Sequence, residues 1–466
     1  MAKEHKRGFF ARMFKKNTEF ISPYTVMDAA RHGNMKTKIS FFIMGFGNMA
    51  YHQWIKGLLF LLVEIAFIAF MVLFGGHCLA MLPGLGDVAQ GEVWNEAKGI
   101  YEYTAGDDSL LILLYGIATI FIIVGFWIIW CGTVKSAYKA QIMYEGGKKL
   151  PTFKEDIADL FDKKMHYTLL TLPVIGIIIF TVLPLVFMIS MAFTNYSVIG
   201  NHLVLFDWVG FRNFGEVLNF GSEIGSQFWA VLAWTLTWAV CATFSNYILG
   251  MILALIINRK DTKGKTFWRF CFILSIAVPQ FVSLLIMRQM LNEQGAINTL
   301  LLNWGWISSP LPFWTNAAWA RVTVIVINCW LGIPYTILQV TGILESIPGD
   351  LYEAAKIDGA NAVTTFFKIT LPYMLFVTTP YLITQFTGNV NNFNVIYLLS
   401  RGDPTQVGHT AGDTDLLVTW LYKLTIDRNL YNTGAVIGIF TFIVLAIVSL
   451  VTYRTSGSYK NEEGFM

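Results

Sequence analysis

Long apolar runs separated by short polar segments dominate the sequence. Eight runs approach the roughly 20 apolar residues that a membrane-spanning helix needs. Short segments with alternating polarity, typical of a transmembrane barrel, are not the pattern, so we expect helices. The sequence therefore predicts an all-α fold, a polytopic membrane protein with eight transmembrane helices. The runs are residues 57–75, 109–131, 167–193, 228–257, 269–290, 321–343, 373–393 and 433–453.

The polar segments divide these runs into two groups. Gly146, Gly147 and Pro151 interrupt the chain after the second run, so we expect two additional N-terminal helices followed by a six-helix core. The mixed aromatic and polar segment 37–56 is too short to span; it is either an interfacial segment before the first span or the start of that span. The expected divisions are a cytoplasmic N-terminus with the interfacial segment (1–56), two transmembrane helices and a cytoplasmic loop (57–160), the core (161–455) and a cytoplasmic tail (456–466).

Lysine and arginine predict the orientation of the chain. They concentrate in residues 3–38, 135–164 and 259–265, whereas the loops 76–108, 194–227 and 291–320 are nearly free of them. Because positive loops stay in the cytoplasm, we expect both termini inside the cell membrane. The net charge of +3 is thus a signal of topology and not of nucleic-acid binding.

Composition and motifs limit the possible chemistry. The 466 residues are 55% hydrophobic and 14% charged, which indicates an integral membrane protein. No catalytic motif is present, the five cysteines lack metal-ligand spacing, and we expect neither an enzyme nor a metal site. Glu64 is the one ionisable residue clearly in mid-membrane; it either makes a structural hydrogen bond or takes part in transport. An ion-coupled carrier usually needs more such residues.

Uncharged polar groups lie inside two of the predicted spans. The stretch "NCWLGIPY" begins at Asn328, and its Gly and Pro are expected to loosen the helix. In "QFTGNVNNFNV", Gln385, Asn389 and Asn392 follow one helical face. These amides either join neighbouring helices or line a site for a hydroxyl-rich solute. In the second case, the aromatic side chains of Trp330, Tyr335 and Phe393 could cover the apolar faces of the solute's sugar rings.

A polar loop, "IPGDLYEAAKIDGANAVTTFFKITLP", separates these two spans. We expect a helix that begins near Pro348 and ends at Gly359, with Ala354 and Ala355 as small knobs, and then a second short helix from about 360 to 369 that Pro372 stops. The loop either only connects two spans or docks on a cytoplasmic partner.

The loop resembles the signature of ATP-binding-cassette importer membrane subunits. The spacing EAA, three residues, Gly, nine residues, Ile-x-Leu-Pro is met in this loop, and "NCWLGIPY", "SIPGDLYEAAKIDGA", "FNVIYLLSRGDPT" and "AGDTDLLVTWLYKL" are similar to the larger membrane subunits of maltose and maltodextrin importers over roughly residues 165–455. The resemblance implies a type I permease core, with the family-type domain at about 228–453 and a coupling loop at 345–372 that docks on a separate ATPase. The signature residues are Glu353, Ala354, Ala355, Asp358, Gly359, Ile369, Leu371 and Pro372.

The resemblance also implies a substrate and partners. The substrate would be an oligosaccharide, maltodextrins first and galacto-oligosaccharides next, with an ion-coupled sugar transporter as the rival. The partners would be a second homologous permease, two copies of an ATPase that uses ATP with Mg²⁺, and an extracellular binding protein; this chain itself would bind no cofactor. Because loop 194–227 lacks the external domain of the enterobacterial subunits, a Gram-positive system with a lipid-anchored binding protein is expected. The implied sugar lining is Asn328, Leu331, Gly332, Tyr335, Gln385, Asn389 and Asn392.

Overall fold

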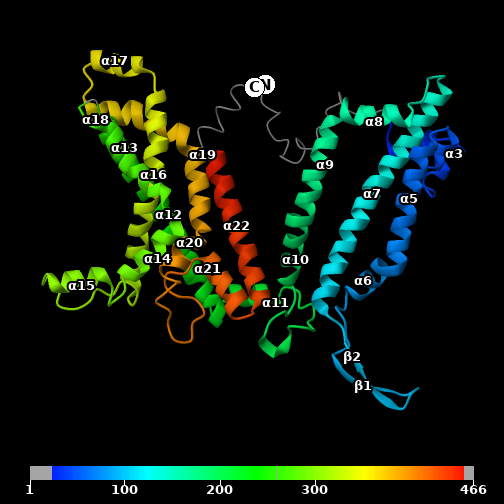
Figure 1. Cartoon of the computed structure of the whole chain (residues 1–466), viewed down its shortest axis with the longest axis horizontal. Helices are drawn as coiled ribbons and strands as arrows, with labels where there is room; N and C mark the ends of the chain where they lie inside the picture. The colour runs from blue at the N-terminus through cyan, green and yellow to red at the C-terminus, as the bar shows by residue number, and fades with distance from the viewer. Residues whose placement is uncertain (1–23, 260, 456–466) are drawn as a thin grey trace, which may run out of the picture. The chain divides into compact units, whose positions relative to one another are not determined.

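The computed structural model describes residues 24–259 and 261–455, and these residues are mostly helical (Figure 1). Within this part of the chain, seven helices are long and apolar enough to cross a membrane, and an eighth span results if a bent helix pair is counted as one. The all-α, eight-span expectation is therefore confirmed. The chain divides into two compact units between Phe187 and Met188. The finer domain bounds stay predictions.

The first unit holds two complete membrane-length segments and most of a third. The second of them, α7, is a continuous helix that extends well beyond the apolar run 109–131. The elements are α2 (Val26–His32), α3 (Met35–Ile39), α4 (Phe46–Ala50), α5 (Trp54–Phe70), η2 (Met71–Gly75), α6 (Gly76–Met81), β1 (Gly91–Asn95), β2 (Ile100–Thr104), α7 (Ser109–Glu145), α8 (Phe153–Phe161), α9 (Met165–Ile177) and η3 (Ile178–Val182), with α10 (Leu183–Met191) crossing the division.

Residues 37–56 fold separately from the first span. The short helices α3 and α4 pack against α7, and α5 begins only at Trp54. The backbone amide of Met44, a fully buried residue, donates a hydrogen bond to Glu64 Oε2 at 2.8 Å. Residues 37–53 are therefore not part of the span, residues 54–56 are its first turn, and Glu64 makes a structural hydrogen bond. The location of the segment before the span at the membrane interface stays a prediction.

A β-hairpin departs from the expected helices. Strands β1 and β2 pair antiparallel, with Gly91 opposite Thr104, and they lie in the loop between the first two spans (Figure 1). Trp94 stands opposite Tyr101, and their rings meet edge to face with centroids 5.1 Å apart. Such cross-strand aromatic pairs stabilise two-stranded ribbons. The alternating stretch "EVWNEAKGIYEYT" carries this signal in the sequence.

In the second unit, α12 and α16 form the most extensive helix pair. They approach closely because glycines replace side chains at the contact: a Cβ at Gly250 would lie 2.5 Å from Thr336 Cβ, inside van der Waals contact. The elements are η4 (Ile199–Asn201), α11 (Arg212–Leu218), α12 (Glu223–Asn258), α13 (Lys265–Ala277), α14 (Gln280–Met290), α15 (Ala296–Asn303), α16 (Ala317–Ser346), α17 (Gly349–Ile357), α18 (Ala362–Thr365), η5 (Phe366–Thr370), α19 (Leu371–Val390), α20 (Phe393–Leu399), α21 (Leu417–Tyr422), η6 (Lys423–Asp427) and α22 (Tyr431–Thr455).

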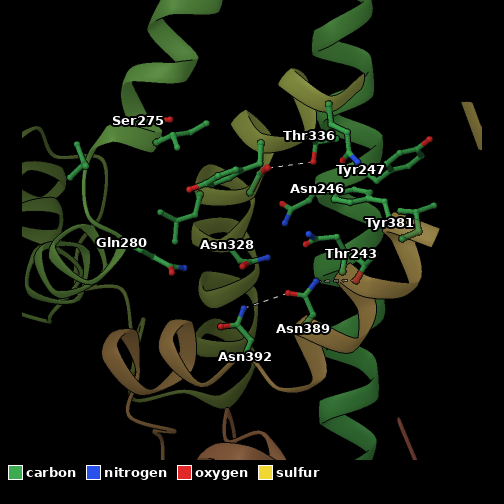
Figure 2. A pocket seen from close by; sticks show the side chains of 18 of the residues that line it. Thr243, Asn246, Tyr247, Ser275, Gln280, Asn328, Thr336, Tyr381, Asn389 and Asn392 are labelled. Atoms are coloured by element: carbon green, nitrogen blue, oxygen red, sulfur yellow. Dashed lines mark hydrogen bonds between the residues drawn. The ribbon is translucent and has the colours of Figure 1, made fainter. Parts of the chain in front are cut away.

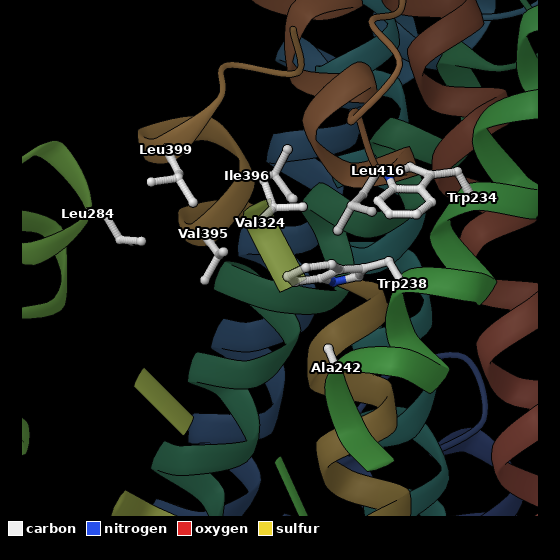
Figure 3. Close-up of a cluster of buried hydrophobic side chains, with 9 residues drawn as sticks. All are labelled: Trp234, Trp238, Ala242, Leu284, Val324, Val395, Ile396, Leu399 and Leu416. Atoms are coloured by element: carbon white, nitrogen blue, oxygen red, sulfur yellow. The ribbon is translucent and has the colours of Figure 1, made fainter. Parts of the chain in front are cut away.

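Two apolar clusters lie along α12 on either side of a short polar stretch. One contains Trp234, Trp238 and Ala242 together with residues of α14, α16 and α20 (Figure 3). The other begins at Tyr247 and includes residues of α16 and α19. The polar residues of α12 between these clusters are thus held at a fixed depth in the bundle.

The fifth expected span, 269–290, is not one straight helix. It consists of α13 and α14, which are bent by 88° at a short break. Pro279 causes the break, because proline lacks the amide donor that would continue the helix and forces the residue before it out of the α region. Val278 is accordingly extended, with φ −79° and ψ 126°.

Candidate functional site

A polar cavity of about 710 Å³ opens in the second unit. Four structural elements surround it: the middle of α12, the break between α13 and α14, the middle of α16, and the end of α19 with the start of α20 (Figure 2). Helix ends and breaks expose backbone and polar side chains at a depth where intact helices would not, so this position suits a solute-binding site.

All seven residues that the sequence proposed as a sugar lining line this cavity. The set comes from two spans, α16 and α19, and the structure brings both to the same cavity. Which of them contact a solute stays a prediction. The residues are Asn328, Leu331, Gly332, Tyr335, Gln385, Asn389 and Asn392.

The lining is polar without being charged. Among its twenty residues are seven amides and six hydroxyls, and no Asp, Glu, Lys or Arg. Amides donate and accept hydrogen bonds at once, as hydroxyl groups of a solute do. The cavity is therefore matched to a neutral, hydroxyl-rich molecule and offers no counter-charge to an ion.

Asn389 connects three elements at the base of the cavity. Its Nδ2 donates to Thr243 Oγ1 of α12 at 3.0 Å, and its backbone carbonyl accepts from Trp238 Nε1 at 3.1 Å. Asn392 Nδ2 donates to Asn389 Oδ1 at 3.4 Å, while Asn392 Oδ1 accepts from the amide of Val395 and so caps α20. Asn392 therefore lies beyond the end of α19, not on its face, yet still reaches the cavity.

Two other amides of the lining are incompletely satisfied. Asn328 Nδ2 and Asn246 Oδ1 are buried and have no hydrogen-bond partner within the described residues. Both side chains lie together between α12 and α16 (Figure 2). A buried amide group without a partner costs roughly 1–3 kcal/mol. Such a cost is recovered when a ligand hydroxyl supplies the missing partner.

Gly332 positions one of these amides. A Cβ at this residue would lie 2.2 Å from Asn246 Nδ2, so only glycine lets the Asn246 side chain pack against α16. The expectation that Gly332 and Pro334 loosen the helix is wrong, because α16 runs unbroken from Ala317 to Ser346 with Pro334 inside it. The neighbouring helix supplies the packing that keeps α16 intact.

The aromatic lining differs from the expected one. Tyr335 lines the cavity as proposed, whereas Trp330 and Phe393 do not. Trp330 lies two residues from Asn328, and at 100° per residue that places it on the opposite face of α16. Phe393 instead stacks on Tyr397, with ring centroids 4.8 Å apart.

Sequence reasoning missed two walls of the cavity. From α12 come Thr243, Asn246 and Tyr247, which follow one helical face in an apolar span. From the break come Ser275 and Gln280, on either side of Pro279. The i, i+3, i+4 polar spacing and the proline within an apolar run are the signals that could have identified them.

The loop at 345–372 adopts a helix, a glycine turn and a second helix. Helix α17 ends at Ile357, and Gly359 follows with φ +73°. The amide of Ala360 donates to the Ala355 carbonyl at 2.9 Å and that of Gly359 to the Lys356 carbonyl at 3.2 Å. This pair of bonds is the Schellman motif, which requires a left-handed residue and therefore favours glycine.

Details of this loop correct the expectation. Ala354 is exposed but Ala355 is buried, so only the first is a knob on the outer surface. Pro372 does not stop the second helix: α18 continues through η5 into α19, and Pro372 follows directly after the π-helical turn η5. Leu371 packs against the apolar cluster around Met374. Docking by Glu353 and Asp358, both exposed, stays a prediction.

Fold and cavity together define a class of protein: a multi-pass helical membrane permease whose central site is polar and uncharged. Residues 246–456 match the family of binding-protein-dependent transport system inner membrane components. The chain is 37% identical over 424 residues to the galactooligosaccharides transport system permease protein of Bacillus subtilis, with 90% of this chain and 97% of that protein covered. It is 36% identical over 433 residues to the maltodextrin transport system permease protein of the same organism, with 90% and 95% covered.

The chain belongs to this family of permeases. A solved structure agrees in fold: it is the crystal structure of a bacterial ABC transporter involved in the import of the acidic polysaccharide alginate. Its matching chain superposes on this chain with a TM-score of 0.53 and 24% sequence identity, and the match covers 64% of this chain and 96% of that chain. The resemblance of the coupling loop to importer membrane subunits is thereby confirmed at the level of the family.

Proposed function

We propose that this chain is the permease subunit of an ATP-binding-cassette importer that carries neutral oligosaccharides across the cytoplasmic membrane. The uncharged cavity of about 710 Å³ carries the proposal. Its amides and hydroxyls match sugar hydroxyls in both donor and acceptor character, and its tyrosines, Tyr247, Tyr335 and Tyr381, offer apolar faces to sugar rings.

Maltodextrins are the first candidate substrate and galacto-oligosaccharides the second. Relatives with each of these names align with 90% of this chain at similar identity. Both sugars are neutral and rich in hydroxyl groups, so the lining suits either. The absence of a charged residue from the lining disfavours acidic sugars, which would need a cationic partner inside the membrane.

The proposed machine has several further parts. This chain would pair with a second permease and with two copies of a cytoplasmic ATPase, which uses ATP and Mg²⁺, and an extracellular binding protein would deliver the sugar. Helix α17 and Gly359 would transmit closure of the ATPase to the spans, so that the central cavity alternates between two states. Both termini would lie in the cytoplasm, in keeping with the Lys and Arg pattern.

The proposal is tested by purification and ATP hydrolysis. The tagged chain is isolated from its native host in mild detergent, and hydrolysis is measured with the binding protein and with maltodextrins, galacto-oligosaccharides or an alginate oligosaccharide as the charged control. We expect a co-purified ATPase and second permease, and stimulation by one of the neutral sugars only. A chain without an ATPase would refute the proposal and favour an ion-coupled carrier.

Variants on α16 connect this result to the cavity. Asn328→Leu removes the buried amide whose Nδ2 has no partner in the described structure, and we expect it to abolish most of the sugar stimulation. Val326→Leu is the matched control, because Val326 is two residues away and 58% exposed. Equal loss in both variants would show that α16 tolerates no change, and would contradict a specific role for the cavity.

A further inference from the structure

A second polar cavity, of about 390 Å³, lies at the other ends of α14 and α20. Arg288 and Asn292 line it from α14 and the loop after it, Trp314 from the loop before α16, and Asp403 from the loop after α20. None of these residues belongs to the central cavity. We call this second cavity the outer cavity.

Two hydrogen-bond donors in this outer cavity lack partners. The indole Nε1 of Trp314 is buried and donates no hydrogen bond to any described residue. The guanidinium of Arg288 makes no ion pair and no hydrogen bond within residues 24–259 and 261–455, and the charges of Arg401 and Asp403 act on it only through space. Unpaired donors on residues that line a cavity are what a ligand with acceptor groups would satisfy.

Charge narrows the chemistry of that ligand. An anion would suit Arg288, but the half-buried carboxylate of Asp403 also lines the cavity and repels it. A sugar carries hydroxyl groups that accept from Arg288 and Trp314 and donate to Asp403, and the Trp314 ring can cover an apolar sugar face. The combination favours a neutral polyhydroxylated ligand.

The position of the outer cavity relates it to the central one. Gln280 and Asn392 line the central cavity at one end of the packed pair α14 and α20, while Arg288 and Ser400 line the outer cavity at the other. Gln280 and Arg288 are eight residues apart, as are Asn392 and Ser400, and eight residues of α-helix rise by roughly 12 Å. An oligosaccharide of several rings is long enough to extend from one cavity to the other, past the buried side chains Leu284, Val395 and Ile396 where α14 and α20 pack, whereas a short sugar is not.

We infer that the outer cavity is a second saccharide subsite, in which Arg288, Trp314 and Asp403 bind the outward end of a long oligosaccharide whose inner end occupies the central cavity. The inference rests on the proposed function. It adds a physical basis for selection by chain length, because only longer sugars gain the outer contacts.

The test is equilibrium binding to the intact complex in nanodiscs, without the binding protein. The probes are maltose and maltohexaose, or the corresponding galactosides if those stimulate hydrolysis. We expect Arg288→Gln to lower the ratio of long-sugar to short-sugar affinity roughly tenfold and Trp314→Phe to lower it about threefold, as for loss of one charged and one neutral hydrogen bond. Arg212→Gln and Trp306→Phe, both exposed residues outside the cavity, are the controls and should leave the ratio unchanged.

The outcomes separate the two proposals. If the wild-type complex binds the long sugar and both variants keep its affinity ratio, the subsite is refuted and the central site stands. If the wild-type complex binds no saccharide, both proposals fail. If Arg288→Gln keeps the ratio but loses stimulation of ATP hydrolysis by the sugar-free binding protein, the cavity is a docking site for that protein, which overturns the inference.

Discussion

Substitutions at Gly359 give the sharpest test of the coupling loop. The residue has φ +73°, and a Cβ built on it would meet no atom of this chain within 4 Å. An alanine there is therefore sterically free, and its only penalty is the left-handed backbone, which costs an L-residue about 1–2 kcal/mol. That energy corresponds to roughly a 5- to 30-fold shift between the ordered turn and a frayed one.

A graded series follows from this reasoning. Asparagine tolerates the left-handed region best among residues with a side chain, so Gly359→Asn should retain most transport and Gly359→Ala less. Gly359→Pro should retain none, because proline fixes φ near −65° and also removes the hydrogen bond that the Gly359 amide donates to the Lys356 carbonyl. Gly349→Ala at the other end of α17 is the matched control: its Cβ would also meet nothing within 4 Å, and its φ is not positive.

The assay is sugar uptake into proteoliposomes alongside ATP hydrolysis by the same complexes. We expect uptake to fall in the order Gly, Asn, Ala, Pro while membrane insertion and the yield of the chain stay constant. Wild-type uptake by Gly359→Pro would refute a coupling role for this turn. An Asn variant no better than Ala would show that glycine is needed for a close approach by a partner rather than for its backbone freedom.

Three further substitutions probe the central cavity and a buried ion pair. Gly332→Ala should displace the Asn246 amide and lower sugar-stimulated ATP hydrolysis several-fold, at a cost of about 1–3 kcal/mol from overpacking, whereas Gly342→Ala on the same helix, where a Cβ meets nothing within 4 Å, should have no effect. Asn389→Leu should weaken sugar-dependent uptake without preventing assembly of the complex, as judged by size-exclusion chromatography; loss of assembly would show that this amide mainly joins helices. Lys423→Met leaves the fully buried carboxylate of Asp415 without its ion pair at 2.6 Å. We expect this change to lower the free energy of unfolding by about 3–5 kcal/mol, measured by thermal denaturation; an unchanged melting temperature would contradict this.

The sequence predicted the spans well because the hydrophobic signal is long and local. Run lengths located every membrane helix, although α7 extends well past the predicted end at residue 131. The break at Pro279 was missed because composition averages over it: α13 and α14 are both apolar, and only the geometry of the proline turns one away from the other. The hairpin was missed because a five-residue strand leaves little periodicity beside runs of this length.

The candidate site was predictable where a single helix carries the information. Gln385 and Asn389 follow one face of α19, and that face lines the cavity. The prediction that Trp330 lines the cavity was wrong, because its angular position on α16 places it outside the cavity. Asn246 was missed although its spacing from Thr243 and Tyr247 is visible in the sequence, whereas its packing against Gly332, which lies on another helix, is visible only in the structure.

The two readings that the sequence left open for the buried amides apply to different residues. Asn389 donates to a hydroxyl on α12 and accepts from Asn392, so it joins helices as well as lining the cavity. Asn328 Nδ2 and Asn246 Oδ1, a donor and an acceptor, have no partner among the described residues. An amide whose only role is to join helices would be expected to form hydrogen bonds with its neighbours, because a buried polar group without a partner lowers the stability of the fold. The unsatisfied pair is therefore the part of the lining for which solute binding offers the better physical explanation, and the strongest effect on sugar binding is expected there.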